Sequence, residues 1–267
     1  MTEPPFFQQF GDVLRRHKNK GLLGIKSEFE SEGIRLTELT ALNLFAKSEG
    51  FKTALKIGGA EAKSDLVLGF EQSCDYIIAP MIESAYAVSK CVEMFKAIQA
   101  QSQFLPPKLL INIETSTALS NLKEIVDSTD GIVSGLVFGR VDFTLSSKLS
   151  RSDIASEYVS QSALQVSRIC KSTDLEFVIG GGISIDSIDL LKQLSDIRLD
   201  RYETRKCILS AETLFSDNIK ILLQDCVLAE LLWLKSKSAM YREMSVEDSA
   251  RIQMLEKRHL YNIKSCE

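Results

Sequence analysis

The sequence predicts an α/β fold, a (β/α)8 TIM barrel with a helical C-terminal extension, from three observations. Short apolar runs alternate with longer segments of helical period, which indicates repeated βα units. The runs are almost continuously apolar, as expected of parallel strands that are buried on both faces. Polar side chains recur where successive runs end, and barrel enzymes build their active sites at the carboxyl ends of their strands.

Seven strands and six intervening helices can be placed in chain order, and the first strand is not followed by the G-x-G-x-x-G turn of a dinucleotide-binding sheet. An eighth strand is expected to be short, or the segment 6–18 caps the barrel instead. The strands are expected at Leu22–Phe29, Thr53–Gly58, Tyr76–Ala79, Leu109–Ile113, Gly135–Phe138, Glu176–Ile179 and Tyr202–Leu209. The helices are expected at Leu36–Ser48, Ala60–Gln72, Ser84–Gln101, Thr117–Ser128, Ile154–Ser172 and Ser184–Ser195.

The chain ends are predicted to be helical and to flank a single barrel domain. We expect an N-terminal helical segment at 1–20, the barrel at 21–215 and C-terminal helices at 216–267. The stretch from Ile219 to Trp233 is unusually apolar for a terminal helix. It either packs on its own chain as the last barrel helix or buries its face against another subunit.

Composition narrows the class of protein. The 267 residues carry a net charge of −4, so the basic footprint of a nucleic-acid-binding protein is missing. No apolar run reaches the length of a membrane span, and the N-terminus does not read as a signal peptide. Six scattered cysteines without C-x-x-C spacing are expected to be reduced thiols of a cytoplasmic protein. The two histidines lie near the chain ends, and we do not expect either to be catalytic.

Two carboxylates at matching positions of consecutive βα units predict a metal site. Glu114 follows the strand that ends in Asn112-Ile113, and Asp142 follows the strand that ends near Gly139. Carboxylates from adjacent barrel strands can share Mg²⁺, which takes one or two protein carboxylates and completes its shell with water and substrate oxygens. The alternative is that the two acids cap the helices that follow them.

Two glycine-containing turns are candidate anion sites. Lys56 ends a strand, and Gly58-Gly59 opens the next helix, so a cation and free backbone N–H groups suit a carboxylate or phosphate. Gly180-Gly181-Gly182 also precedes a helix and permits close approach of a ligand. A plain βα turn is the alternative at both places.

Two charged runs complete the set of candidates. In the run 202–206, alternation places Glu203 and Arg205 on one strand face, where a barrel interior would hold them as an ion pair. In the run 26–32, Glu28 and Glu30 either supply a base with a raised pKa or simply border the site.

Several segments together resemble the HpcH/HpaI aldolase and citrate lyase β-subunit family, from about Gly24 to Lys206. The segments that carry the resemblance are LKIGGAEAKSD, DYIIAPMIES, LLINIET, GLVFGRVDF and RYETRK. The resemblance implies a phosphoenolpyruvate/pyruvate-type TIM barrel that assembles as a homo-oligomer, a trimer or hexamer with exchanged terminal helices.

The resemblance also implies roles for particular residues. Glu114 and Asp142 would be the ligands of Mg²⁺, Mn²⁺ or another divalent cation. Lys56 occupies the position of an arginine that holds the substrate carboxylate, backbone amides around Gly139, Arg140 and Val141 would cradle a 2-oxo acid, and Asn112 stands where the family often has a polar supporting group. The family's early acidic-histidine motif is absent, because the equivalent run is Glu28-Phe29-Glu30. Lysine at 56 also loses the bidentate grip of arginine.

The predicted function is a divalent-metal-dependent carbon–carbon lyase of the aldolase type, acting on a 2-oxo acid through an enolate. Lys56 would hold the carboxylate, and Glu28, Glu30 or a metal-bound water would be the base. Glu61 and Arg140 would contact the distal part of the substrate. The expected partner is this small molecule and a second copy of the chain, with no nucleic acid or membrane. The alternatives are a non-catalytic metal- and carboxylate-binding barrel and an enzyme similar to citryl-CoA lyase.

Overall fold

The computed structural model describes residues 5–241 and 246–264, and the chain forms two compact units. One unit is Gly24–Ala211 and contains the barrel. The other combines Met1–Leu23 with Glu212–Glu267, so the predicted N-terminal and C-terminal helical segments lie in the same unit.

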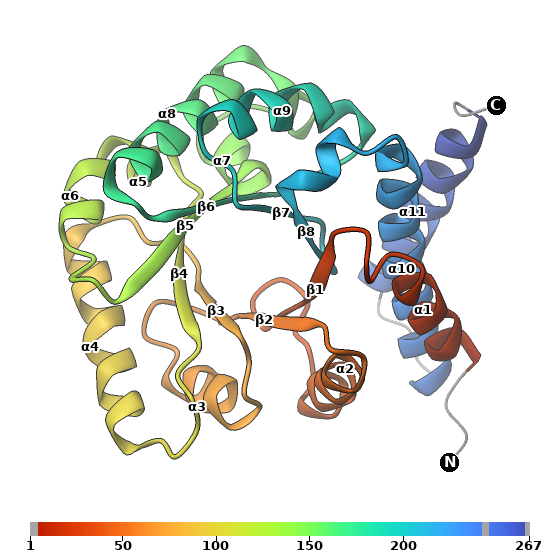
Figure 1. Ribbon diagram of the computed structural model, residues 1–267, viewed down its shortest axis with the longest axis horizontal. Helices are drawn as coiled ribbons and strands as arrows, with labels where there is room; N and C mark the ends of the chain where they lie inside the picture. Colours follow the sequence, from red (N-terminus) through yellow and green to blue (C-terminus); the bar gives the residue numbers. More distant parts are fainter. Residues whose placement is uncertain (1–4, 242–245, 265–267) are drawn as a thin grey trace. The chain divides into compact units, whose positions relative to one another are not determined.

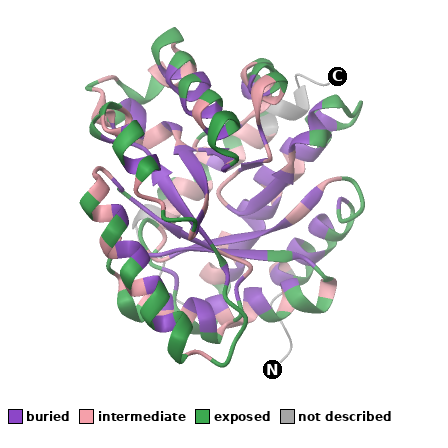
Figure 2. Ribbon diagram, turned by 60° about the vertical axis from the view of Figure 1, so that its left-hand side comes forward, coloured by how far each residue is buried: buried purple, intermediate pink, exposed green. Residues whose placement is uncertain are grey.

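The barrel is closed by eight strands in sequence order, which confirms the predicted fold class. Figure 1 shows the strands around the centre and helices outside them. Each strand from β1 to β6 pairs in parallel with the next, and the strands are almost entirely buried (Figure 2). Their bounds are β1 Leu22–Glu28, β2 Lys52–Lys56, β3 Tyr76–Ala79, β4 Lys108–Ile113, β5 Val133–Gly139, β6 Glu176–Gly180, β7 Arg201–Glu203 and β8 Cys207–Ser210.

The helices of this unit follow the strands and begin at recognisable caps. The Ser84, Thr115 and Ser156 hydroxyls each accept a backbone N–H of the first turn of α4, α5 and α8. The helices are α2 Leu36–Glu49, α3 Lys63–Glu71, α4 Ala85–Gln101, α5 Ser116–Ser120, α6 Leu122–Asp127, α7 Arg140–Ser146, α8 Glu157–Thr173 and α9 Ile188–Ile197, with 3-10 turns η1 Arg151–Ala155 and η2 Ile185–Ser187. Helix α7 was not among the predicted helices, because its seven residues are too few to show a helical period.

The prediction of one strand over Tyr202–Leu209 is wrong. The run contains β7 and β8, which pair antiparallel with Tyr202 opposite Leu209. The turn between them is held by Thr204, whose backbone N–H donates to the Cys207 carbonyl and whose hydroxyl accepts the Cys207 N–H. No helix separates the two strands, so the eighth strand departs from the regular βα repeat.

The second unit consists of helices α1 Pro5–Arg15, α10 Ile219–Met240 and α11 Val246–Lys264 and the turn η3 Ala211–Phe215 at its border. Trp233 of α10 packs against Phe7 and Phe10 of α1, with ring centroids 6.1 Å apart in both pairs. Val227 and Leu231 form a buried cluster with Leu255 of α11. These contacts within one chain cover part of the apolar face of α10, and the predicted homo-oligomer stays a prediction.

Two features of composition can be located in the described residues. Cys74, Cys91, Cys170, Cys207 and Cys226 are all buried, and Cys266 lies outside the described residues. Burial raises the pKa of the Cys74 and Cys91 thiols to about 11, which keeps them protonated and unreactive. Within 5–241 and 246–264, none of the helices combines the length and apolarity that crossing a membrane requires.

Candidate active site

Glu114 stands at the centre of a buried polar cluster at the carboxyl end of β4. Its Oε2 accepts hydrogen bonds from the Asn112 amide at 2.6 Å and from the Lys56 ammonium at 3.2 Å. Its Oε1 accepts the backbone N–H of Met81 at 3.0 Å. The side chain is 1% exposed. The helix that follows is capped by Thr115 instead, so Glu114 does not have the capping role that the sequence left open.

Met81 contributes to this cluster through its backbone. It follows β3 and has a φ of 53°, which is uncommon for a non-glycine residue and costs free energy. This left-handed conformation accompanies the donation of the Met81 N–H to Glu114. The sequence carries no signal for it, because neither Pro80 nor Met81 favours a positive φ.

Asn112 leaves a buried acceptor without a partner. Its amide nitrogen donates to Glu114, which directs Oδ1 away from that carboxylate. Oδ1 is buried and has no hydrogen-bond partner in the structure. An unsatisfied buried acceptor costs about 1–3 kcal/mol, so such an atom in a native site calls for a donor or cation that binds there.

Gly139 ends β5 directly against Glu114. A Cβ atom added at Gly139 would lie 2.6 Å from the Glu114 Oε2 and 2.8 Å from its Cβ. The chain then turns into α7, and Asp142 lies in the first turn of that helix, partly exposed. The residue that caps α7 therefore lies against Glu114, and Asp142 follows it by three residues.

Arg140 faces the protein rather than a substrate. Its guanidinium donates to the carbonyls of Gly181 and Gly182 at 3.0 and 2.8 Å and to the Ser187 hydroxyl at 3.0 Å. Burial lowers its pKa to about 10. The predicted contact of this side chain with the distal part of a substrate finds no support in this geometry. The carbonyls of the triple glycine turn therefore bind the Arg140 guanidinium of the protein itself.

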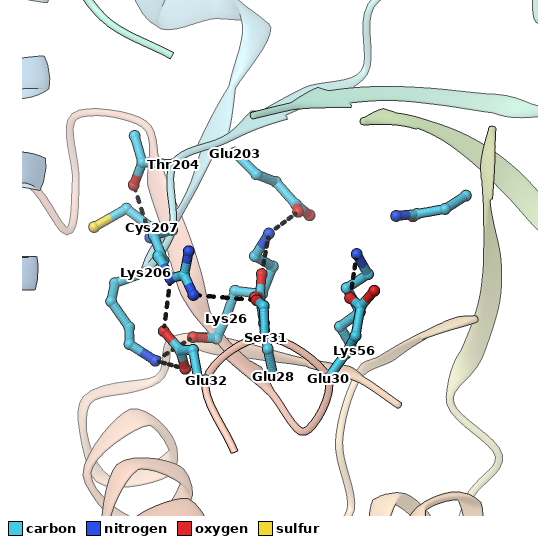
Figure 3. Close-up of polar contacts among 12 residues, drawn as sticks. Lys26, Glu28, Glu30, Ser31, Glu32, Lys56, Glu203, Thr204, Lys206 and Cys207 are labelled. Atoms are coloured by element: carbon cyan, nitrogen blue, oxygen red, sulfur yellow. Dashed lines mark hydrogen bonds and ion pairs between the residues drawn. The ribbon is translucent and has the colours of Figure 1, made fainter. Parts of the chain in front are cut away.

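Lys56 links the Glu114 cluster to the loop after β1. Its ammonium contacts the Glu30 carboxylate (Figure 3), at 2.6 Å. The same ammonium lies 3.2 Å from Glu114. Burial by itself would lower the pKa of Lys56, but Glu114 and Glu30 outweigh it and the pKa is raised. Lys56 is therefore a cation rather than a nucleophilic amine.

Lys26 and Glu28 form a second buried cluster with Glu203. The Lys26 ammonium lies 2.9 Å from Glu28 and 3.3 Å from Glu203. Burial by itself would lower the pKa of Lys26, but the two carboxylates raise it above its ordinary value. Glu203 thus pairs with Lys26, whereas Arg205 pairs with Glu32, so the predicted Glu203–Arg205 ion pair is wrong. The β7–β8 turn interrupts the alternation on which that prediction rested.

Glu28 is expected to make the barrel sensitive to acid. Burial by itself would raise the pKa of Glu28, but Lys26, Arg205 and the Ser31 hydroxyl hold it well below the ordinary 4.5. A carboxyl group with a depressed folded-state pKa stabilises the fold above its unfolded-state pKa, and this stabilisation is lost as the pH falls through the folded-state value. We expect the free energy of unfolding, measured by urea titration, to decrease as the pH falls below about 4.5.

The matching variant is Glu28→Gln. Its free energy of unfolding at neutral pH should be about 2–4 kcal/mol lower than that of the natural protein, because the substitution removes one carboxylate from a buried ion cluster. It should also lose stability less steeply in acid than the natural protein. Equal acid dependence in the two proteins would show that Glu28 is not the group responsible.

The remaining predicted residues lie at the edge of these clusters. Glu61 is exposed, at 3.9 Å from Lys90, and α3 begins only at Lys63, after the Gly58-Gly59 turn. The Gly58 N–H donates to Asp65 at 2.7 Å and so is already satisfied. Val141 is partly exposed in the first turn of α7, where backbone N–H groups have no partner within the helix.

The donor set around Glu114 fits a hard divalent cation. Glu114 has one acceptor position left on Oε1, Asn112 Oδ1 is an orphaned acceptor, and Asp142 offers a partly exposed carboxylate in the first turn of α7. Among the described residues, no group of three or more His, Cys, Asp or Glu side chains is arranged to hold a metal. Two protein carboxylates are nevertheless enough for Mg²⁺, which takes its other ligands from water and substrate.

The part of the chain that carries this site matches a known family. Residues 57–180, from the end of β2 to the end of β6, match the family model HpcH/HpaI aldolase/citrate lyase. The chain therefore contains a segment of the HpcH/HpaI type. The predicted resemblance is confirmed, and the match supports a lyase of the aldolase type.

Solved structures share this barrel fold at low sequence identity. The HpcH/HpaI aldolase from Desulfitobacterium hafniense DCB-2 is 13% identical with a TM-score of 0.59, over 73% of this chain and 82% of that one. An HpcH/HpaI aldolase/citrate lyase family protein from Burkholderia cenocepacia J2315 is 11% identical with a TM-score of 0.59, over 73% and 83%. Citrate synthase SbnG is 12% identical with a TM-score of 0.57, over 73% and 81%. At such identities the likeness shows the fold alone. No curated protein matches the sequence.

Proposed function

We propose that this barrel is a divalent-metal-dependent carbon–carbon lyase of the aldolase type that acts on a 2-oxo acid. The observation that carries the proposal is the buried Glu114 cluster, in which Lys56, Asn112 and the Met81 N–H orient one carboxylate at the carboxyl end of β4. Barrel enzymes place their chemistry at this end, and the family match supports the reaction type.

Glu114 and Asp142 would hold the cation, with Mg²⁺ as the first candidate. When bound, such an ion acts as a Lewis acid that polarises the 2-oxo group of the substrate. The charge of the site favours this. The Lys56 ammonium contacts the carboxylates of Glu30 and Glu114, so +1 with −2 leaves a formal charge of −1, and the Asp142 carboxylate would add a further −1. A divalent cation balances that charge.

The chain's own residues would bind and orient the substrate. The Lys56 ammonium would hold the 1-carboxylate, and the backbone N–H groups at the start of α7, around Gly139–Val141, would donate to substrate oxygens. Asn112 would accept a hydrogen bond from a hydroxyl group or water at Oδ1, while its amide nitrogen keeps Glu114 in place.

Of the two carboxylates predicted as possible bases, the geometry favours Glu30. Glu28 is held by Lys26 and Ser31, and its lowered pKa makes it a weak proton acceptor near neutral pH. Glu30 lies in the loop after β1, and its carboxylate touches Lys56, the residue that would hold the substrate. Glu30 would therefore stand closest to the hydroxyl proton that a retro-aldol cleavage removes.

Exchange of the methyl protons of pyruvate tests this proposal. With Mg²⁺ in D₂O, the protein should wash deuterium into the methyl group, followed by NMR, because enolate formation needs no aldehyde partner. The exchange should stop with EDTA and return with added Mg²⁺. Pyruvate that binds without exchange would instead indicate a non-catalytic carboxylate-binding barrel and would overturn the lyase assignment.

A further inference from the structure

The loop between β1 and α2 lies over the polar clusters at the barrel mouth. It leaves β1 after Glu28 and is closed by the Ile34 N–H, which donates to the Glu28 carbonyl at 3.2 Å. Gly33, with a φ of 54°, allows the chain to turn back before α2. Every acidic side chain of this loop is engaged by a cation or a hydroxyl, as Figure 3 shows.

Glu30 occupies the ammonium that the proposed function assigns to the substrate. Its Oε2 lies 2.6 Å from the Lys56 Nζ, closer than the Glu114 oxygen at 3.2 Å. The Lys56 side chain is 9% exposed, so it has little surface left for another anion. A substrate carboxylate that binds this ammonium closely would compete with Glu30 for it.

The neighbouring residue Glu32 fixes the loop from its other side. It forms ion pairs with Lys206 and with Arg205, whose Nε lies 3.4 Å from Oε1. Lys206 is 1% exposed and also donates to the Lys26 carbonyl at 3.3 Å, so this attachment is buried. The Ser31 hydroxyl donates to Glu28 and accepts a hydrogen bond from the Arg205 guanidinium.

The attachment depends on the irregular eighth strand. Arg205 and Lys206 are consecutive residues in the turn between β7 and β8, and the antiparallel hairpin directs both to one loop. In a regular βα unit, β7 would run on into a helix at this point.

We propose that Glu30 is an internal carboxylate that occupies Lys56 in the ligand-free protein, and that Glu32 is a positioning residue that holds it there. The inference rests on the proposed function, because it takes Lys56 as the carboxylate-binding group. Entry of a 2-oxo acid then moves Glu30 from the ammonium to the side of the bound substrate. The affinity of the site is reduced by the fraction of time that Glu30 occupies Lys56.

Two substitutions at Glu30 distinguish competition for Lys56 from a general effect of removing a negative charge. Glu30→Gln removes the competing charge and should bind oxalate, a planar mimic of the 2-oxo-acid end, about tenfold more tightly. Glu30→Asp keeps the charge but is one methylene shorter, which weakens its contact with Lys56. It should also bind oxalate more tightly, by about threefold. Glu71→Gln removes a charge from the exposed surface of α3 and is the control.

A double-mutant cycle tests the role of Glu32. Glu32→Gln should tighten oxalate binding about threefold alone and have no effect in the Glu30→Gln background, because it acts only through Glu30. Arg205→Gln, which leaves the Lys206–Glu32 pair intact, is the milder variant if Glu32→Gln unfolds. All dissociation constants are measured by titration calorimetry with Mg²⁺ at neutral pH.

The outcomes distinguish the two proposals. Tighter binding by both Glu30 variants, with a non-additive cycle, supports the inference. If the natural protein and all variants bind oxalate with the same affinity, the inference about Glu30 is wrong, but the lyase proposal is unaffected. Oxalate that binds to none of the proteins contradicts the proposed function itself, and the inference falls with it.

Discussion

Replacing Asp142 by asparagine is expected to lower the 2-oxo-acid-dependent activity at least about a thousandfold while the protein stays folded. The asparagine keeps the shape of the side chain but not the charge that a divalent cation needs. No described contact ties Asp142 to a neighbouring side chain, so its substitution should change the free energy of unfolding by less than about 0.5 kcal/mol. Deuterium wash-in with Mg²⁺ and thermal unfolding are the two measurements.

The corresponding change at Glu114 should differ in a way that the geometry specifies. Glu114→Gln should also abolish exchange, but it should cost about 2–3 kcal/mol of stability, because three donors that now face carboxylate oxygens would face an amide. Full exchange activity in Asp142→Asn at saturating Mg²⁺ would remove Asp142 from the metal site. Loss of folding in Asp142→Asn would show that its role is structural.

Replacing Gly139 by alanine is expected to displace Glu114 and reduce activity by about a hundredfold. The new Cβ would lie 2.6 Å from the Glu114 Oε2, inside any normal contact distance. Gly139 has a φ of −89°, which alanine adopts freely, so the effect would be steric and not conformational. Overpacking of this kind should cost about 1–3 kcal/mol, measured by urea unfolding.

Gly59 supplies the matched control for this prediction. It lies in the turn after β2 in the same barrel unit, and no atom lies within 4 Å of a Cβ added there. Gly59→Ala should therefore leave stability within about 0.5 kcal/mol and activity unchanged. If the two glycine variants behave alike, the contact between Gly139 and Glu114 is not what requires glycine.

The barrel could be predicted because its signals are local. β3 is observed with the bounds that the sequence predicts, and β4 and β6 differ by one residue. Apolar continuity, helical period and caps such as Ser84 lie within short windows of sequence, where each element is largely decided. The prediction of one strand over 202–209 failed because a turn stabilised by Thr204 interrupts this run without glycine or proline.

The candidate site was partly predictable for the same reason. Glu114, Asn112 and Lys56 each end a strand, and the ends of parallel strands meet at one rim, so their proximity follows from the fold class. Arg140 could not be assigned correctly from the sequence, because the position of a residue in a motif does not indicate in which direction a long side chain points.

The sequence by itself determined the barrel, its working end and the residue types gathered there, since these depend on periodicity and on residues close in the chain. Only the tertiary structure decided which charged side chains form ion pairs with each other. Glu30 reaches Lys56, Glu32 reaches Lys206, and Lys26 reaches Glu203 across strands that are distant in sequence. The energy of an ion pair depends on separation in space and on burial, and neither quantity can be read from order along the chain.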